Sequence, residues 1–428
     1  MQARTIIRHG LVVGPKIVKN TDLCIEDNII TQVADSIEPA ASDEVIDATG
    51  KYIIPGFIDV HNHGAMGFDA TFGSYQIDLD AFSCEPDLFA ENLKSALQFY
   101  RSRGVTRTLL TTMASPHENI LESLKLIDES LALLPQSLQR ICAGINIEGT
   151  FLKMPAYAGA QNPDYFADAD VDLFDRLNEA CGHRIKMVNV PPEQGEKGME
   201  LIEHVQRMDI AVAGGHTGSS FDQFTLAVDK GLSLAVHFFN GPSRSSSKPF
   251  DGGGAEEAML YHDDVSLELI LDGYHVNPLY VRDAIARKGV DGIVGITDSM
   301  FVNGLDDVVQ FSLAGLTGQV SGDRKYLHQP GGTETLFGSV LSMDRAYSNL
   351  LSWLTTEMTG FWYRKHEAYS LEDALVAASQ MCSLNAAHQI GLGAETGSIE
   401  VGKAADLLIV DLAANDDLEI VNLDLAIA

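Results

Sequence analysis

Eight short apolar runs alternate with helix-like segments along this chain, and this rhythm limits what it can fold into. The runs cover residues 53–60, 106–112, 141–147, 185–190, 210–214, 232–236, 265–271 and 292–296. Amphipathic segments such as 87–102, 118–134, 171–180 and 195–208 separate them. Strands that are apolar on both faces are typical of a parallel sheet covered by helices.

Two folds fit such a repeat, namely a doubly wound open sheet and a (β/α)8 barrel. The repeat extends from residue 53 to residue 298, close to the roughly 250 residues of a typical barrel. The number of units therefore favours an α/β protein built on a (β/α)8 TIM-type barrel.

Both ends of the chain have β character, with short strand-like runs in residues 5–50 and again in 397–411. We expect them to pair as one small β-sandwich domain. This divides the chain into residues 1–52 (sandwich), 53–388 (barrel) and 389–428 (sandwich). Residues 301–335 form a Gly- and Asp-rich insertion, in which the alternating stretch 310–313 suggests a hairpin.

Polar residues that can bind metals or protons stand at the ends of six of the apolar runs. They are His61 with His63, then Glu148, His216, His237, His275 and Asp298. Residues i and i+2 of a strand share a face, so His61 and His63 can chelate one metal. Any one histidine could equally be a cap or a core residue, but a barrel gathers all the strand ends at one mouth. The pattern predicts a metal-dependent active site there.

The composition narrows the partners and the compartment. The 29 basic and 60 acidic residues give a net charge of −31, which disfavours nucleic acid and anionic membranes as partners. No apolar run reaches the ~18 residues needed to span a bilayer, and we expect no signal peptide. The five scattered cysteines suit a reducing cytoplasm and argue against a Cys-type zinc site.

Several stretches resemble the amidohydrolase superfamily and, within it, the N-acetylglucosamine-6-phosphate deacetylases. Residues 55–64 (PGFIDVHNHG) and 397–411 (GSIEVGKAADLLIVD) are similar to superfamily motifs. More specific similarities are at 147–149 (IEG), 161–163 (QNP), 191–193 (PPE), 215–216 (GH), 272–276 (DGYHV), 297–298 (TD) and 338–343 (GSVLSM). The resemblance covers nearly the whole chain.

The resemblance implies roles for the residues at the mouth. Glu148, His216 and His237 would bind the catalytic metal, while His61 and His63 would bind a second metal bridged by Glu148. Zinc is the metal that we expect, and iron, manganese, cobalt and nickel suit the same ligands.

For the remaining residues the resemblance implies contacts with the reaction and the substrate. Asp298 would be the general acid and base, and His275 would contact the substrate. Asn240 and Gly241 would help to hold the substrate, which is a small amino sugar.

Phosphate recognition follows less directly from the residues. Family members use an arginine and a histidine, for which the nearest counterparts here are Lys248 and Gln161, with Arg244 close by. The loop 241–248 could hold a phosphate, or it could be a plain surface loop. In the family this loop serves the neighbouring subunit, which would imply a homodimer.

We therefore expect removal of acetyl from an N-acetylated amino sugar, namely N-acetylglucosamine 6-phosphate, by attack of a metal-bound hydroxide. Two alternatives stay open. One is an amidohydrolase of another N-acyl or cyclic amide without a phosphate. The other is a binding or scaffold protein on a barrel frame.

Overall fold

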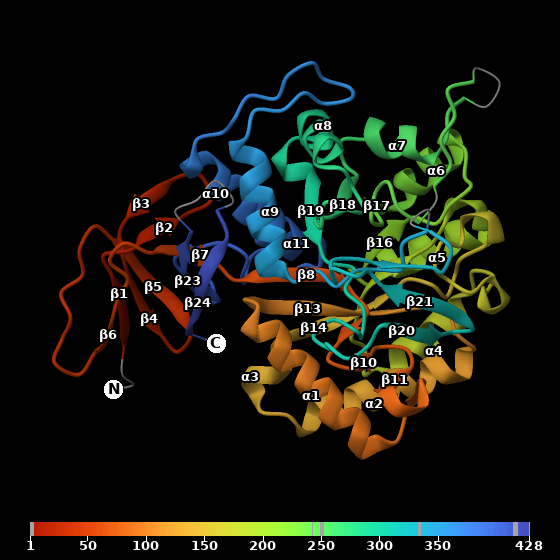
Figure 1. The fold of residues 1–428 in the computed structure, drawn as a ribbon, viewed down its shortest axis with the longest axis horizontal. Coiled ribbons are helices and arrows are strands. Elements are labelled where there is room, and N and C mark those ends of the chain that lie inside the picture. The colour runs from red at the N-terminus through yellow and green to blue at the C-terminus, as the bar shows by residue number, and fades with distance from the viewer. Residues whose placement is uncertain (1–3, 242, 249–251, 333–334, 414–417, 428) are drawn as a thin grey trace.

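The computed structural model describes residues 4–427, apart from 242, 249–251, 333–334 and 414–417 (Figure 1). At its centre lies an eight-stranded parallel sheet in which neighbouring strands follow one another in the sequence. Its strands are β8 (Phe57–Asn62), β13 (Val105–Thr112), β14 (Cys142–Ile147), β15 (Ile185–Asn189), β16 (Ala211–Gly214), β17 (Leu232–Ala235), β18 (Ser266–Ile270) and β19 (Ile293–Ile296). A doubly wound sheet would instead reverse its strand order part-way.

The sheet closes between its first and last strands. Asn62 forms a parallel bridge with Ser299, and the backbone N–H of Asp298 donates to the carbonyl of His61 at 2.9 Å. The predicted (β/α)8 barrel is thus confirmed, and the doubly wound alternative is wrong.

Helices cover the outside of the barrel, as Figure 1 shows. They are α1 (Pro86–Ser102), α2 (His117–Leu133), α3 (Gln136–Gln139), α4 (Val171–Ala180), α5 (Glu196–Gln206), α6 (Phe221–Lys230), α7 (Ala255–Tyr261), α8 (Pro278–Lys288), α9 (Met343–Thr355), α10 (Leu371–Ser379) and α11 (Asn385–Gln389). Local sequence fixes several of their starts. Asp170 caps α4 by accepting from the N–H of Leu173, and Ser220 and Gln223 form a capping box on α6.

Both ends of the chain build a second, all-β unit beside the barrel, at the left of Figure 1. One sheet has the order β5 (Ile29–Ala34), β4 (Asp22–Glu26), β1 (Thr5–Arg8), β6 (Glu44–Asp47). The other has the order β24 (Ile420–Ile427), β23 (Leu407–Leu412), β7 (Tyr52–Pro55), β2 (Leu11–Val13), β3 (Val18–Asn20). The chain termini thus pair as expected, and the proposed divisions at 52/53 and 388/389 stay predictions.

The run 53–60 differs from the single strand that we expected. It breaks at Gly56 into β7, which belongs to the small unit, and β8, which belongs to the barrel. A Cβ at Gly56 would collide with Thr106, so the barrel wall comes too close for any larger residue. The N–H of Gly56 donates instead to the carbonyl of Asp406 at 2.8 Å, which ties the two units together.

Short strands form a roof over the barrel mouth. The insertion after β19 folds into an antiparallel sheet of β20 (Gln310–Leu313), β21 (Leu316–Val320) and β22 (Leu327–His328), which confirms the expected hairpin. A second small sheet follows β8, with strands β9 (Gly64–Ala65), β10 (Phe68–Asp69), β11 (Gly73–Gln76) and β12 (Ala81–Ser83). Phe301, Phe311, Phe337 and Tyr75 pack between them in a separate hydrophobic cluster.

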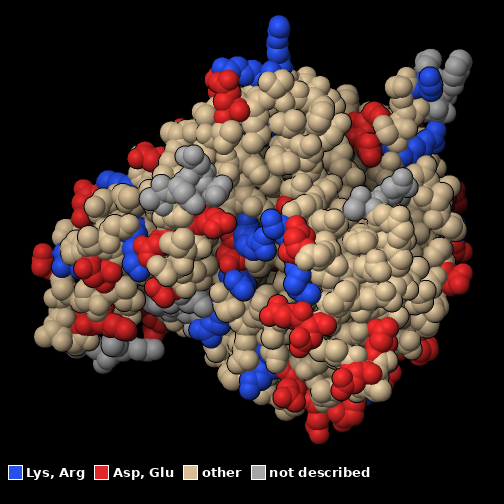
Figure 2. Space-filling view, viewed as in Figure 1, with Lys and Arg blue, Asp and Glu red and all other residues tan. Residues whose placement is uncertain are grey.

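Charged side chains are spread over the outer surface of the molecule. In the view of Figure 2, acidic groups are frequent over the lower right of the molecule, where Figure 1 shows α1 and α2. Among the described residues, no helix combines the length and the apolar character needed to cross a bilayer.

Candidate active site

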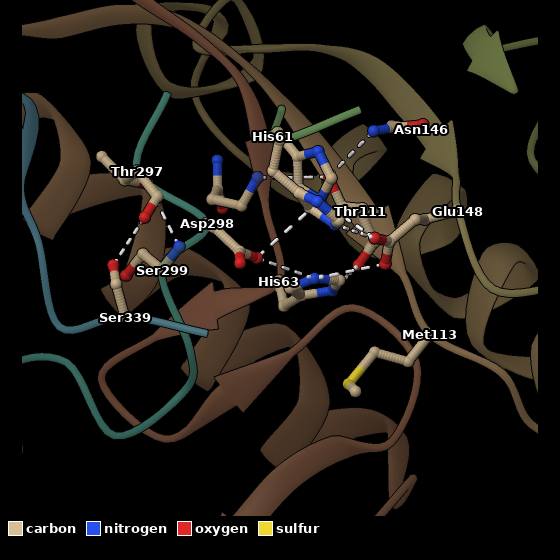
Figure 3. A network of polar contacts seen from close by, with 12 residues as sticks. His61, His63, Thr111, Met113, Asn146, Glu148, Thr297, Asp298, Ser299 and Ser339 are labelled. Carbon is tan, nitrogen blue, oxygen red and sulfur yellow. Dashed lines mark hydrogen bonds and ion pairs between the residues drawn. The ribbon is translucent and has the colours of Figure 1, made fainter. Parts of the chain in front are cut away.

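The strand ends bring the predicted metal ligands together at the carboxyl end of the barrel. Figure 3 shows His61, His63, Glu148 and Asp298 pointing toward one another from the ends of β8, β14 and β19. His63, Glu148 and Asp298 line a cavity of about 620 Å³ together with His216 and His237, and His61 lies beside them. This volume lies in the range of small-molecule sites.

Glu148 is the centre of the group. Its Oε1 lies 3.2 Å from His216 Nε2 and 2.9 Å from His237 Nε2. The same oxygen is 3.6 Å from His61 Nε2, and Oε2 is 3.5 Å from His63 Nε2. The carboxylate therefore lies between two pairs of histidines, which is where a ligand shared by two metals would have to be.

Asp298 completes the His61–His63 side of the site. Its Oδ1 lies 3.2 Å from His63 Nε2 and 3.8 Å from His61 Nε2. Burial raises the pKa of Asp298, but the hydrogen bond from His63 and the charges of both histidines outweigh it, so the pKa falls below its usual value. At neutral pH this side chain is a carboxylate that can accept a proton.

The tautomers of three histidines are fixed from outside the site. The Nδ1 atoms of His61, His63 and His216 meet Glu268 Oε2 at 2.9 Å, the Thr111 carbonyl at 3.1 Å and the Tyr157 carbonyl at 2.9 Å. Each Nδ1 must donate to its oxygen, so each Nε2, once deprotonated, would present its lone pair to a bound metal. Such outer hydrogen bonds are characteristic of metal-binding histidines.

The donor set fits a divalent cation. Ligand atoms of His61, Glu148 and His237 lie within 4.8 Å of one another, and so do those of His61, His63 and Asp298. His61 Nε2 is buried and forms no hydrogen bond to a described residue. Although burial lowers the pKa of His61, the charges of Glu268 and Glu148 raise it to about 10, so the site favours positive charge at this position.

Three of these residues have an uncommon backbone conformation. The φ angles of His216, His237 and Asp298 are 50°, 23° and 51°. Side chains other than glycine rarely adopt positive φ, and such conformations cost of order 1–3 kcal/mol each. The barrel holds these residues in this geometry, which turns each side chain into the mouth just past its strand.

Other predicted residues line the same cavity, namely Gln161, Asn240, Gly241 and His275. His275 Nδ1 meets Asp272 Oδ2 at 2.7 Å, and this contact raises the pKa of His275 against the lowering effect of burial. Gln161 bonds to Glu148 Oε2 at 2.6 Å and accepts from the N–H of Ala114 at 2.7 Å. Its amide thus orients Glu148, a contact that the sequence did not suggest.

Comparison with known proteins identifies the family. The model of the Amidohydrolase family matches residues 52–427 of this chain. The chain belongs to the amidohydrolase family. N-acetylglucosamine-6-phosphate deacetylase of Bacillus subtilis (strain 168) is 30% identical to this amidohydrolase over 410 residues, which cover 94% of this chain and 91% of that protein. N-acetylgalactosamine-6-phosphate deacetylase of Escherichia coli O157:H7 is 28% identical over 394 residues, 91% of this chain and 90% of that one.

Solved structures agree with this fold. N-acetylglucosamine-6-phosphate deacetylase of Thermotoga maritima has a TM-score of 0.75 and 25% identity, with 98% of each chain covered. The Mycobacterium smegmatis enzyme of that name has a TM-score of 0.80 at 22% identity, covering 99% of this amidohydrolase and 99% of that chain. At 22% identity, the similarity to the Mycobacterium smegmatis structure shows a shared fold and nothing further.

The two cations that we expected to meet a phosphate lie apart from the cavity wall. Arg244 and Lys248 are not among its lining residues, and the described lining includes no lysine or arginine. Lys248 is exposed and Arg244 is partly buried in the loop that follows Gly241. Both stay predictions as substrate contacts.

Sequence reasoning missed two buried carboxylates behind the site. Glu268 bonds to His61, and Asp59 accepts from Thr297 Oγ1 at 2.6 Å just before Asp298. Burial raises the pKa of Asp59 to about 6 despite that hydrogen bond. Each is the lone charged residue of an apolar strand, and that signal could have identified them because unpaired charges are rarely buried.

Substitution of Gly241 tests how closely the loop packs against the imidazoles of His216 and His237. Its φ is +48°, and a Cβ there would lie 2.5 Å from His216 Cε1 and closer still to His237 Cε1. We expect Gly241→Ala to displace these imidazoles and to lower metal content and activity at least tenfold, measured by elemental analysis and turnover. Gly252→Ala is the matched control, because Gly252 also has positive φ, +67°, but its Cβ would meet nothing within 4 Å. Equal metal content in the two variants would contradict the geometry described for Gly241.

Proposed function

We propose that this amidohydrolase removes the acetyl group from N-acetylglucosamine 6-phosphate. The observation that carries the proposal is the convergence of four histidines, Glu148 and Asp298 at the carboxyl end of the barrel. The curated relatives of the chain include deacetylases of N-acetylglucosamine 6-phosphate and N-acetylgalactosamine 6-phosphate, so the same chemistry on a related hexosamine phosphate fits the same site.

The ligand set implies one or two divalent metals. Glu148, His216 and His237 would hold one, and His61 and His63 would hold a second, with Glu148 between them. A bound divalent cation lowers the pKa of water toward ~7 and polarises a carbonyl. Mixed histidine and carboxylate ligands suit zinc, which we propose, and also iron, manganese, cobalt or nickel.

The protein's own side chains then move the proton and hold the substrate. Asp298 is ionised at neutral pH, so it accepts the proton of the attacking water and delivers it to the amide nitrogen that leaves. His275, fixed through Nδ1 by Asp272, lines the cavity and can donate to the substrate. Asn240 and Gly241 form the neighbouring wall and help to hold the sugar.

A second candidate function follows from the charge of the cavity wall. Since its described lining includes no lysine or arginine, a phosphate would need Arg244, Lys248 or a partner subunit for its counter-charge. A neutral N-acyl or cyclic amide would need none of them. This alternative shares the hydrolytic site and differs only in the substrate.

We also propose a cytoplasmic homodimer. All five cysteines are free, and four of them are buried, which suits a reducing compartment. The loop between α9 and α10, at the top of Figure 1, presents Phe361, Trp362 and Tyr363 with exposures of 55%, 46% and 38%. Exposed neighbouring aromatic residues are characteristic of protein interfaces, and a second copy would cover them.

The central prediction concerns amide hydrolysis itself. We expect the metal-loaded protein to release acetate from N-acetylglucosamine 6-phosphate and to lose activity on treatment with a chelator. Glu148→Gln should lower kcat by about a thousandfold, the effect of losing several kcal/mol of charge stabilisation. Glu118→Gln, at an exposed carboxylate, is the control. Full activity and unchanged metal content in Glu148→Gln would rule the proposal out.

Phosphate recognition has a separate test. We expect Arg244→Ala and Lys248→Ala each to raise KM for N-acetylglucosamine 6-phosphate about tenfold, as the loss of one charged hydrogen bond implies, and to leave KM for N-acetylglucosamine unchanged. Lys16→Ala, at an exposed lysine of the small unit, is the control. If the wild-type enzyme hydrolysed neither sugar but cleaved another amide, the result would favour the alternative function.

The homodimer is tested by light scattering after size exclusion. We expect the wild type to have twice the mass of the 46.3 kDa chain, and the double variant Phe361→Ser, Trp362→Ser to have the mass of one chain. Leu133→Ser, at an exposed leucine on α2, should leave the dimer intact. A wild-type monomer at micromolar concentration would refute the proposal.

A further inference from the structure

Strand β18 contains a single charged residue, Glu268, in the sequence Ser266-Leu267-Glu268-Leu269-Ile270. Its side chain is fully buried in the barrel. Removing a carboxylate from water costs several kcal/mol unless hydrogen bonds or opposite charges compensate. A packing residue at this position would avoid that cost, so the charge needs an explanation.

Both hydrogen bonds that the side chain accepts come from metal-site residues. Oε2 accepts from His61 Nδ1 at 2.9 Å and from the backbone N–H of His237 at 3.0 Å. One oxygen thus connects the His61–His63 half of the site to the His216–His237 half. The other oxygen, Oε1, is buried and has no hydrogen-bond partner among the described residues.

The contact with His61 differs from the support of the other histidines. Backbone carbonyls, which are neutral, hold the Nδ1 atoms of His63 and His216. Of the four histidines, only His61 meets a carboxylate through its Nδ1 atom in the described part of the chain. A charged acceptor makes the imidazole a stronger base at Nε2 and therefore a stronger metal ligand.

The charges around His61 also favour a cation at its Nε2 atom. Glu268 lies behind the His61 ring, and the oxygens of Glu148 and Asp298 lie in front of its Nε2, at 3.6 and 3.8 Å. Three carboxylates around one buried imidazole leave an excess of negative charge. A cation bound at Nε2 would balance it, and the partnerless Oε1 of Glu268 would be stabilised by the same positive charge.

We propose that Glu268 is the positioning residue that sets the metal affinity of the His61–His63 half of the site, by fixing the proton of His61 on Nδ1 and by tying that ring to the backbone of His237. The proposal rests on the metal binding assumed in the proposed function. It goes beyond the ligand set, because Glu268 is not among the residues that line the cavity, and its side chain bonds to His61 and His237.

A purely structural role is the competing explanation, since Glu268 also belongs to the barrel sheet. The test is therefore a direct measurement of metal affinity on the full-length protein. The metal-free protein is titrated with Zn²⁺ in competition with a chromophoric chelator, and Co²⁺ absorption reports the coordination of the ligands. Thermal unfolding is recorded on the same samples.

Glu268→Gln keeps the size of the side chain and removes its charge. We expect the Zn²⁺ dissociation constant of the weaker site to rise about 10- to 100-fold, the usual effect of losing such an outer contact, with a changed Co²⁺ spectrum. Asp283→Asn is the matched control. Asp283 is likewise fully buried and accepts from a histidine, but that histidine is His366, and the other hydrogen bonds of Asp283 come from the backbone of Phe361 and Trp362, outside the metal site, so metal affinity should not change.

A double variant tests whether Glu268 affects metal binding through His61. If Glu268 acts through His61, then Glu268→Gln should change the affinity much less in a His61→Ala background, because contacting residues are non-additive. If Glu268→Gln fails to fold, Glu268→Asp replaces it, since the shorter side chain moves the carboxylate away from His61 Nδ1 and should weaken Zn²⁺ binding in the same way.

The outcomes are distinct. Unchanged Zn²⁺ affinity in the folded Glu268 variant, or an equal loss in Asp283→Asn, would overturn the inference and leave the proposed function standing. A wild-type protein that binds no metal would overturn both.

Discussion

The closure of the barrel between its first and last strands is the constraint on which the site depends. The N–H of Asp298 donates to the carbonyl of His61, and Ser299 pairs with Asn62. This seam brings residues that are more than two hundred positions apart in the sequence into contact. It places the carboxylate of Asp298 beside two imidazoles, and the other ligands follow the carboxyl ends of other parallel strands.

Electrostatics then decides what the mouth can hold. Glu148, Asp298 and Glu268 are all buried, and each would be unstable there without positive charge close by. The histidines provide part of that charge. Burial raises the pKa of Glu148, but the surrounding histidines lower it well below its usual value. Burial lowers the pKa of His61, but the neighbouring carboxylates raise it well above its usual value. The buried carboxylates at the mouth of the barrel therefore favour a bound cation. The favourable interaction of these side chains with a cation would offset the strained backbone at His216, His237 and Asp298.

Loops rather than strands shape the substrate cavity. Much of its wall comes from residues between 155 and 161, from 239–241, from 274–275 and from 335–338. Their positions follow from packing of aromatic side chains such as Phe301 and Phe311 under the roof, and from contacts such as that of Asn162 with the carbonyl of Ala314 at 2.8 Å. The residues proposed for hydrolysis thus stand at the strand ends, whereas the residues that shape the substrate cavity lie mainly in loops.

The sequence by itself determined the barrel, since runs that are apolar on both faces can only be buried between helices, and their number fits a closed sheet. It also determined which residues stand at the strand ends, because that position depends only on where each apolar run stops. Only the tertiary structure decided that Gln161 orients Glu148, that Gly56 separates two sheets, and that Glu268 supports His61. These contacts join residues that are distant in the chain, and no local pattern of hydrophobicity or charge encodes their distances.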